Sequence, residues 1–378
     1  MEIIVSPNSF KGSLTSIQVS KLIYEGLKVY NPNFKIKKLP IADGGDGSLD
    51  IFKLYLKYNS VKKTFLNPIG EKITTEYITI EDNKTAIIEF SNASGLILMN
   101  DKKKNHRKLS SFGTGQQIKS AIEMGVKNII ICLGGSATID GGAGILRALG
   151  VKFFDIYSNE ILDENPIIKM KNFDLSNFIT LNKKINFHIL VDVKNSLLGK
   201  FGAVKIFGKQ KGLKEKDFNL FEKSMLEFSK LTDKKFLSKT SDIIGGAAAG
   251  GAAAFLKEFL NAKIYNGTEY ILNKINYKSF LSRRFILITG EGRLDSQSLF
   301  GKAPISLTKF LKKENFFSIA IGGSVEHGKI NKFLNHFDLV FSSCDSNNLD
   351  FCLKNAENNL FDLSKKIGKI INYLNLSK

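Results

Sequence analysis

One local pattern recurs along the chain: a short apolar segment leads directly into a polar loop rich in glycine. In the clearest cases the apolar segments are residues 3–5, 35–39, 128–133, 285–289 and 317–321. Such segments are typical of buried parallel strands, whose loops gather at the carboxyl edge of the sheet. Glycine lets backbone N–H groups approach an anion closely, and a following helix N-terminus favours negative charge. Because these loops also carry Asp, Glu, Lys, Ser and Thr, we expect an anion-binding active site at this edge.

Helical patterns alternate with these strands at both ends of the chain. Thr15 and Gln18 have capping-box spacing ahead of one helix, and another helix is expected over 49–56. Between the two ends, residues 71–80 and 85–90 have the pattern of strands joined by a short turn, as in a mixed sheet. We therefore predict an α/β fold: a flavodoxin-like, doubly wound parallel sheet with a second α/β domain, containing a mixed sheet, inserted into it.

The length of 378 residues also favours two domains over one compact core. We expect the flavodoxin-like α/β domain to comprise residues 1–65 and 265–378, and the inserted α/β domain to comprise residues 66–264. The active site is expected in the cleft between them.

The net charge of +19 raises the question of a polyanionic partner. The lysines are dispersed, only 102–104 form a run, and Arg, which reads bases and grips phosphates, is scarce. The sequence contains no recognisable helix-turn-helix, zinc-finger or aromatic RNA-binding signature. We therefore expect a solvated, lysine-rich surface and no nucleic-acid partner, although the electrostatic field still favours small anionic substrates.

The cysteines and the apolar segments bear on location. Cys132, Cys344 and Cys352 are odd in number and share no metal-ligand spacing, so a disulfide-stapled secreted domain is not expected. The N-terminal residues lack the basic and long apolar regions of a signal peptide. The most apolar later stretch, 243–256, is rich in Gly and Ala and shorter than the ~20 residues that span a bilayer. These features predict a soluble, cytoplasmic protein without a membrane partner.

The short motifs of several enzyme classes are missing. Gly-Lys pairs at 199, 208 and 301 lack the following Ser or Thr of a P-loop, and Gly290-x-Gly292 does not continue into a dinucleotide-binding fingerprint. There is no H-E-x-x-H, and the four histidines are scattered. Zinc chemistry and a Ser-His-Asp hydrolase are therefore disfavoured.

Ten segments, in order along nearly the whole chain, resemble the motifs of the type I glycerate kinase family, bacterial enzymes that phosphorylate D-glycerate with ATP. They are SPNSFKGSL (6–14), PIADGGDG (40–47), EFSNASGL (89–96), SSFGTG (110–115), LGGSATIDGGAG (133–144), VDVKNSLLG (191–199), FGKQKG (207–212), GGAAAGG (245–251), ITGEGRLDSQSLFGKAP (288–304) and AIGGSV (320–325). The family's fold, a flavodoxin-like domain with an inserted α/β domain, agrees with the architecture predicted above. The resemblance implies a kinase that uses ATP and Mg²⁺ to phosphorylate D-glycerate, with 2-phosphoglycerate the favoured product, and it leaves a homodimer open.

Departures from the family pattern keep two alternatives open. Asn8, Asp46 and Ile139 stand where the family usually has Asp, Glu and Asn. Asn8 and Asp46 keep an oxygen ligand, whereas Ile139 keeps no polar group. The alternatives are a kinase of another small hydroxy acid and a non-catalytic relative that only binds nucleotide or phosphate.

Phosphoryl transfer needs neutralised phosphate charge, a divalent metal and an oriented hydroxyl. Asp43 and Asp46, in a loop flanked by glycine, are predicted to hold Mg²⁺. Asp192, between two valines at a strand end, is expected to be partly desolvated and is predicted to be the general base. Lys11 and Arg293 are predicted to grip phosphate or carboxylate and to complete the catalytic group.

The other candidate residues are predicted to contact substrate or phosphate. In the terminal segments they are Asn8, Ser9, Ser13, Gly290, Glu291, Asp295, Gly322, Gly323 and Ser324. In the inserted domain they are Gly134, Gly135, Ser136, Thr138, Asp140, Gln210 and Lys211. The stretch 245–251 is expected to permit close packing and is assigned no chemistry.

Overall fold

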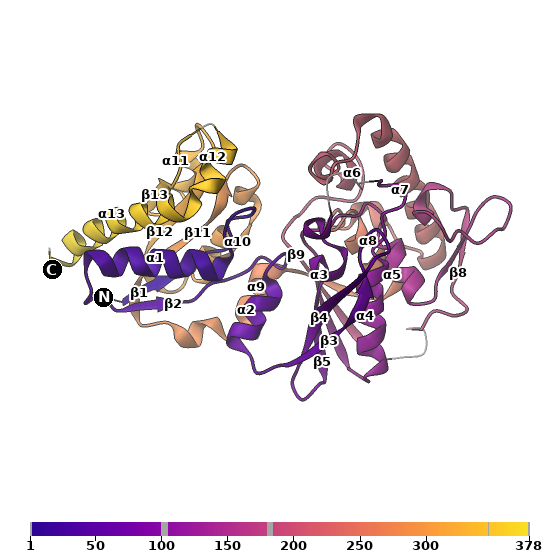
Figure 1. Ribbon diagram of the computed structural model, residues 1–378, viewed down its shortest axis with the longest axis horizontal. Coiled ribbons are helices and arrows are strands. Elements are labelled where there is room, and N and C mark those ends of the chain that lie inside the picture. The colour runs from indigo at the N-terminus through magenta and orange to yellow at the C-terminus, as the bar shows by residue number, and fades with distance from the viewer. Residues whose placement is uncertain (1, 100–104, 180–183, 347, 377–378) are drawn as a thin grey trace. The chain divides into compact units, whose positions relative to one another are not determined.

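The structure, a computed structural model, describes residues 2–99, 105–179, 184–346 and 348–376. The lysine run at 102–104 lies outside the described residues. The chain forms two compact units (Figure 1). Unit 1 comprises Met1–Asp43 and Thr268–Lys378, and unit 2 comprises Gly44–Gly267.

The first boundary between the units lies at residue 43 and not after residue 65, as the sequence suggested. The reason is strand pairing. Strand β3 (Asn59–Leu66) pairs antiparallel with β4 (Lys72–Ile80), so the segment that precedes β4 belongs to the sheet of unit 2. Helix α2 (Ser48–Tyr55) also lies in unit 2.

Unit 1 contains a five-stranded sheet in which every neighbouring pair is parallel. Its order, β13-β12-β11-β1-β2, becomes 2-1-3-4-5 when the five strands are renumbered along the chain. That is the flavodoxin-like doubly wound order, so the predicted fold class is confirmed. The strands are β1 (Glu2–Val5), β2 (Ile36–Lys38), β11 (Arg284–Leu294), β12 (Asn315–Val325) and β13 (Leu339–Ser342).

Helices cover both faces of this sheet. Helix α1 (Ser16–Tyr30) begins with the predicted capping box at Thr15, and it packs with α13 (Ala356–Leu376) on the face that carries Ile319 and Ile321. On the opposite face, Ala320 packs with residues of α10 (Ala303–Phe310) and α11 (Ile330–Phe333). Figure 1 shows α1 and α13 side by side. The remaining helices are α9 (Gly267–Lys274) and α12 (Leu349–Lys354).

Unit 2 contains a six-stranded mixed sheet of order β10-β9-β6-β5-β4-β3, as predicted for the inserted domain. The pairs from β10 to β5 are parallel, and the pairs β5–β4 and β4–β3 are antiparallel. The further strands are β5 (Thr85–Glu89), β6 (Asn128–Cys132), β9 (Asn186–Val191) and β10 (Lys263–Asn266), with a separate pair β7 (Lys152–Phe154) and β8 (Asn172–Asp174). The further helices are α3 (Ser91–Ser94), α4 (Phe112–Glu123), α5 (Ala143–Ala148), α6 (Ala203–Phe207), α7 (Glu215–Phe236) and α8 (Ala252–Phe259).

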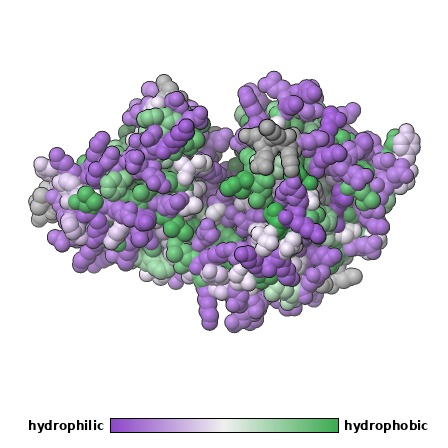
Figure 2. All heavy atoms as spheres, viewed as in Figure 1, coloured by the Kyte–Doolittle hydropathy of each residue, from purple (hydrophilic) through white to green (hydrophobic). Residues whose placement is uncertain are grey.

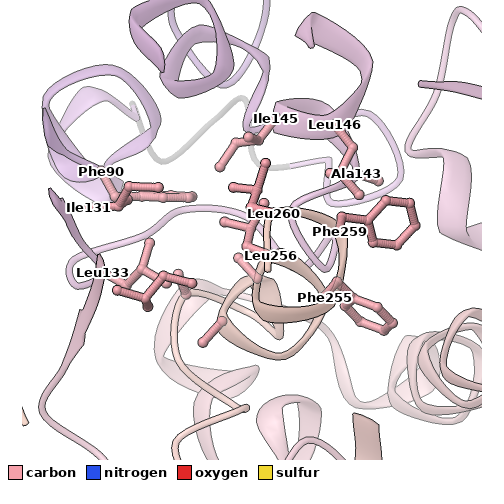
Figure 3. Close-up of a cluster of buried hydrophobic side chains, with 14 of the residues drawn as sticks. Phe90, Ile131, Leu133, Ala143, Ile145, Leu146, Phe255, Leu256, Phe259 and Leu260 are labelled. Carbon is pink, nitrogen blue, oxygen red and sulfur yellow. The ribbon is translucent and has the colours of Figure 1, made fainter. Parts of the chain in front are cut away.

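The core of unit 2 lies between its helices and its sheet. In Figure 3, side chains of α8, including Phe255 and Leu256, gather with Ile145 of α5 and with Ile131 of β6. Ile139 belongs to the same core and is fully buried. Its departure from the family pattern therefore places an apolar side chain in the core.

The chain enters and leaves unit 2 at neighbouring points. Gly44 has a φ of +89°, and a Cβ placed on it would lie 2.7 Å from the Cα of Gly267. Only glycine suits both that backbone conformation and that close approach. The first and last residues of unit 2 are thus in contact.

A disulfide joins Cys344 and Cys352, which the sequence analysis did not anticipate. The two residues are eight positions apart, one shortly after β13 and the other in α12. The bridge therefore closes a small local loop of unit 1 and does not staple a whole domain. Cys132, at the end of β6, is buried.

The surface agrees with the predicted solvated character. On the face shown in Figure 2, hydrophilic residues cover most of both units, and hydrophobic ones form small groups. Within the described part of the chain, the structure contains no helix with both the length and the apolar character needed to cross a bilayer.

Candidate functional site

In unit 1, the glycine segments that were expected to be loops continue the strands. The register of β11 with β12 joins Gly290 to Ile321, Glu291 to Gly322 and Arg293 to Ser324. A Cβ on Gly290 would overlap the carbonyl of Ile321. Glycine is therefore needed here for close strand approach, and Glu291 is held on a regular strand.

The loop after β1 lies beside this extended strand. The backbone N–H of Asn8 donates to the carbonyl of Gly290 at 2.8 Å, and its side-chain amide donates to Asp43 Oδ2 at 3.1 Å. The ammonium of Lys11 lies 3.7 Å from the same carboxylate oxygen. Since β1 and β11 are the strands at which the order of a doubly wound sheet reverses, this is where such folds bind ligands.

Glu291 is the most deeply buried acid of this region after Asp43, with 6% of its surface exposed. Burial raises the pKa of its carboxyl to about 7, against the opposing effects of Lys302, a hydrogen bond from Ser298, and Lys11, while Asp43 raises it further. Its Oε1 is buried and accepts no hydrogen bond from any residue that the structure describes. We call Lys11, Asp43, Glu291 and Lys302 the carboxylate–lysine cluster.

Arg293 and Asp295 follow Glu291 but are used differently. The Arg293 side chain is exposed, and its Nε lies 3.9 Å from Asp295 Oδ2. Asp295 Oδ1 accepts from the backbone N–H groups of Gln297 and Ser298, at 2.9 and 3.1 Å. Asp295 therefore shapes the turn after β11, and Arg293 is accessible to a ligand.

The other unit 1 candidates lie on the surrounding loops. The Ser13 hydroxyl donates to the carbonyl of Phe10 at 3.1 Å, within its own turn, and Ser9 is half-buried. The carbonyls of Gly322 and Gly323 accept from the backbone N–H groups of Ser343 and Cys344, at 2.8 and 3.1 Å. Ser324 is half-buried beside Arg293 on the neighbouring strand.

In unit 2, the loop after β6 lies against the second half of the DGGDG motif. A Cβ on Gly134 would overlap Gly45, and one on Gly135 would overlap the carboxylate of Asp46. Gly135 also has a φ of +57°. The two glycines thus leave room for Asp46, which brings together two motifs that are far apart in the sequence.

Lys211 is a buried cation beneath the same loop, with 4% of its surface exposed. Its ammonium donates to the hydroxyl of Ser136 and to the carbonyl of Thr138, the latter at 2.9 Å. Burial lowers the pKa of Lys211 to about 7, and Asp140 opposes this effect. The structure therefore confines a lysine next to a glycine-rich loop, although Gln210 beside it in the sequence is exposed.

Asp140 is fully buried, and both of its oxygens are used within the fold. Oδ2 accepts from the N–H and hydroxyl of Ser111 and from the N–H of Gly144, and Oδ1 accepts from the N–H of Gly142. Such a carboxylate holds the loop before α5 in place. We therefore assign Asp140 no ligand contact, in contrast to the sequence-based expectation.

Glu89 is a buried carboxylate that positions a loop of the site, and it was not among the residues predicted from the sequence. It ends β5, is 5% exposed, and accepts hydrogen bonds from the N–H groups of Gly47 and Leu49, at 3.0 and 2.8 Å. The Ser91 hydroxyl donates to it at 2.8 Å. Glu89 thus fixes the loop that carries Asp46 at the start of α2. The available signal was its place at the end of an apolar strand.

Asp192 follows β9 directly and is half-buried, as expected for a residue at a strand end.

A cavity of about 320 Å³ opens beside the segment after Lys211. Its lining includes His106, Lys214 and Phe221, together with Arg107, whose guanidinium lies 3.0 Å from a carboxylate oxygen of Asp217.

Comparison with known proteins identifies the family. The family model described as "Glycerate kinase family" matches residues 3–372. The glycerate 2-kinase of Escherichia coli is 34% identical over 97% of both chains, and the glycerate kinase of Halalkalibacterium halodurans is 34% identical over 90% of both. A crystal structure of a Salmonella typhimurium protein, provisionally named glycerate kinase 2, superimposes with a TM-score of 0.78 at 31% identity, over 100% of this chain and 99% of that one. The chain therefore belongs to the glycerate kinase family of enzymes.

Proposed function

We propose that the protein transfers the γ-phosphate of ATP to the 2-hydroxyl of D-glycerate, with 2-phosphoglycerate as the product. The observation that supports this proposal most strongly is the position of the carboxylate–lysine cluster, beside the strands β1 and β11 at which the order of the unit 1 sheet reverses. D-Glycerate has one carboxylate and two hydroxyls. It therefore matches a site that offers both ammonium groups and carboxylate oxygens.

For the divalent metal, Asp43 and Asp46 are the proposed ligands. Mg²⁺ in kinases is usually held by one or two carboxylates together with phosphate oxygens and water. In the described part of the chain, no three His, Cys, Asp or Glu side chains gather around one point. Gly135 leaves room for the Asp46 carboxylate where any side chain would overlap it. Carboxylate oxygens are the ligands that a small hard cation prefers, so the donor chemistry of Asp43 and Asp46 fits Mg²⁺. Bound there, Mg²⁺ would neutralise negative charge on the phosphates.

We assign the nucleotide phosphates to the loop of Gly134, Gly135 and Ser136. Glycine permits close approach of the backbone to phosphate oxygens. Lys211 supports this assignment because its ammonium lies directly on Ser136. Burial disfavours the charged form of a lysine, and a nearby anion such as phosphate stabilises that charged form.

The remaining catalytic roles stay with the residues predicted from the sequence. Asp192 is the proposed general base that accepts the proton of the reacting hydroxyl. Lys11, with 56% of its side chain exposed, and the exposed Arg293 are proposed to bind the substrate carboxylate and the transferred phosphate. Both cations can reorient toward a ligand because neither is buried.

A coupled assay of ADP release from the purified protein tests the proposal, with and without D-glycerate. Phosphorus NMR of the product distinguishes 2-phosphoglycerate from 3-phosphoglycerate. We expect D-glycerate-dependent ADP release and the 2-phosphate. ADP release that does not respond to D-glycerate, or that responds only to another hydroxy acid, would reject the proposed substrate.

We further propose a cytoplasmic location and small-molecule partners, with a homodimer left open. The absence of nucleic-acid binding is supported by the dispersed lysines. Binding to a DNA duplex at ~150 mM salt should be no tighter than ~10⁻⁶ M, which is typical of non-specific contacts. A filter-retention titration measures it.

A further inference from the structure

The carboxylate of Glu291 combines deep burial with one oxygen that the described residues leave without a donor. The side chain is 6% exposed, and Oε1 accepts no hydrogen bond within the described part of the chain. Buried carboxylate oxygens are normally satisfied, because an unsatisfied one loses its water without compensation. The exceptional oxygen therefore calls for a donor from outside the protein.

The fold gives Glu291 little freedom to find another partner. It lies within β11 and pairs in register with Gly322 of β12. The residues on either side of it, Gly290 and Gly292, are in close contact with β12 and with the loop of Lys11. The backbone of Glu291 is therefore held on both sides, and with only 6% of its surface exposed the side chain has little room to turn toward solvent.

We propose that Glu291 Oε1 accepts a hydrogen bond from the 3-hydroxyl of D-glycerate and thereby determines specificity for it. This assignment rests on the proposed function, in which the 2-hydroxyl is the one that is phosphorylated. Glu291 contacts the hydroxyl that does not react, while Lys11, at the same edge of the sheet, is positioned for the carboxylate of the same ligand.

The surroundings of Glu291 favour a hydroxyl over other ligand groups. The negative charge of Asp43 also acts on the Glu291 carboxyl, so an anionic group at Oε1 would meet two negative charges. Lys302 and Lys11 already supply positive charge near this carboxyl, so Oε1 needs no further cation. A neutral group that donates a hydrogen bond fills the open acceptor position without adding charge. A site built around such a contact strongly rejects an analogue without the donor.

Calorimetric titration with three ligands tests the contact without requiring turnover. D-Glycerate carries both hydroxyls, D-lactate has the same configuration but lacks the 3-hydroxyl, and 3-hydroxypropanoate lacks the 2-hydroxyl. We expect the wild-type protein to bind D-glycerate at least ~100-fold more tightly than D-lactate. Glu291→Ala should weaken binding of D-glycerate and 3-hydroxypropanoate by roughly 10- to 100-fold, as expected when a buried hydrogen-bond donor is left without its acceptor, and should leave D-lactate within about threefold.

Two further variants complete the design. Asp350→Asn removes a carboxylate from an exposed position of α12, and it should leave all three affinities unchanged. Glu291→Gln keeps an acceptor oxygen without the charge, so it should retain part of the preference for D-glycerate, and it replaces Glu291→Ala if that variant does not fold. Equal weakening of D-lactate and D-glycerate would overturn the proposal, and so would an unchanged preference in both Glu291 variants. If the wild-type protein bound none of the three acids, the proposed function itself would fail instead.

Discussion

Two buried glutamates, one in each unit, share the same chemistry but differ in how their oxygens are used. Glu89 in unit 2 and Glu291 in unit 1 are both deeply buried, which raises the pKa of each carboxyl to about 7. Both oxygens of Glu89 accept hydrogen bonds, from Gly47, Leu49 and Ser91. Glu291 keeps one oxygen without a donor among the described residues.

The comparison separates a carboxylate that maintains the fold from one that is available to a ligand. Burial and pKa alone do not distinguish the two, because they are nearly the same for both side chains. What distinguishes the two side chains is whether each carboxylate oxygen accepts a hydrogen bond from the described residues. Asp140, whose two oxygens accept four hydrogen bonds, falls with Glu89 on the structural side.

The largest effect on turnover should come from a fourth carboxylate, Asp192, because it is the proposed proton acceptor. Asp192→Asn should lower kcat by about 10²–10⁴-fold, the usual cost of losing a general base, with little change in KM. Glu291→Gln should instead act mainly on KM. Steady-state kinetics of both variants measures the difference. If Asp192→Asn kept more than half of the wild-type kcat, Asp192 would be structural.

The two glutamates should differ next in their contribution to stability. Glu89→Ala should lower the free energy of unfolding by about 2–4 kcal/mol, because it leaves the buried N–H of Leu49 and the half-buried N–H of Gly47 without an acceptor. Glu291→Ala should cost less than about 1 kcal/mol, since it removes a partly unsatisfied group. Urea unfolding of both variants tests the contrast. Equal losses of unfolding free energy would mean that Glu89 and Glu291 contribute equally to the stability of the fold.

A pH titration extends the comparison to a buried cation. The pKa of Lys211 is about 7 in the folded protein and has its ordinary value of 10.5 in the unfolded chain. Between pH 7 and 10.5 the unfolded chain therefore binds one more proton at this residue than the folded protein does. Stability from this group rises from pH 7 to 10.5, by at most about 1.4 kcal/mol per pH unit. Lys211→Met should abolish that rise, as measured by urea unfolding across this pH range.

Glu89 has the opposite pH dependence. Its pKa is raised from 4.5 to about 7, so it contributes stability below pH 4.5 that is lost as the pH rises through 7.

The smallest expected effect concerns the metal requirement. Asp43→Asn should raise the Mg²⁺ concentration needed for half-maximal rate and lower kcat moderately, with little change in melting temperature, because one oxygen ligand remains. Asp46, already shorter than the family's usual Glu, should tolerate the same change better. The measurement is rate against Mg²⁺ concentration. Curves that coincide with the wild type for both variants would show that the metal is held elsewhere.

The parts of the fold that local signals encode could be predicted from the sequence. The capping box of Thr15 and Gln18 marked the start of α1, and the apolar segments marked the central strands of both sheets. The first boundary could not be placed, because β3 is mostly exposed and lacks the apolar pattern of a buried strand. Its membership of unit 2 is decided by pairing with β4, which is a tertiary contact.

The site was predictable only where sequence neighbours act together. The glycine-rich strand ends marked the region of Glu291 and Lys11. The role of Glu89 was not visible, since its donors Gly47 and Leu49 lie 42 and 40 positions earlier in the chain. Likewise, the sequence could not show that Asp140 is satisfied within the fold. Its hydrogen-bond donor Ser111 lies 29 positions away, so Asp140 was predicted to contact a ligand.

The contact between Gly44 and Gly267 has a consequence for how this protein can be taken apart. All of unit 2 is one uninterrupted stretch of chain whose first and last residues touch. Domains with adjacent ends tolerate excision, transplantation and circular permutation well. We therefore expect residues 44–267 to fold as a transferable module, and a short linker from Asp43 to Thr268 to leave an unbroken five-stranded flavodoxin-like protein.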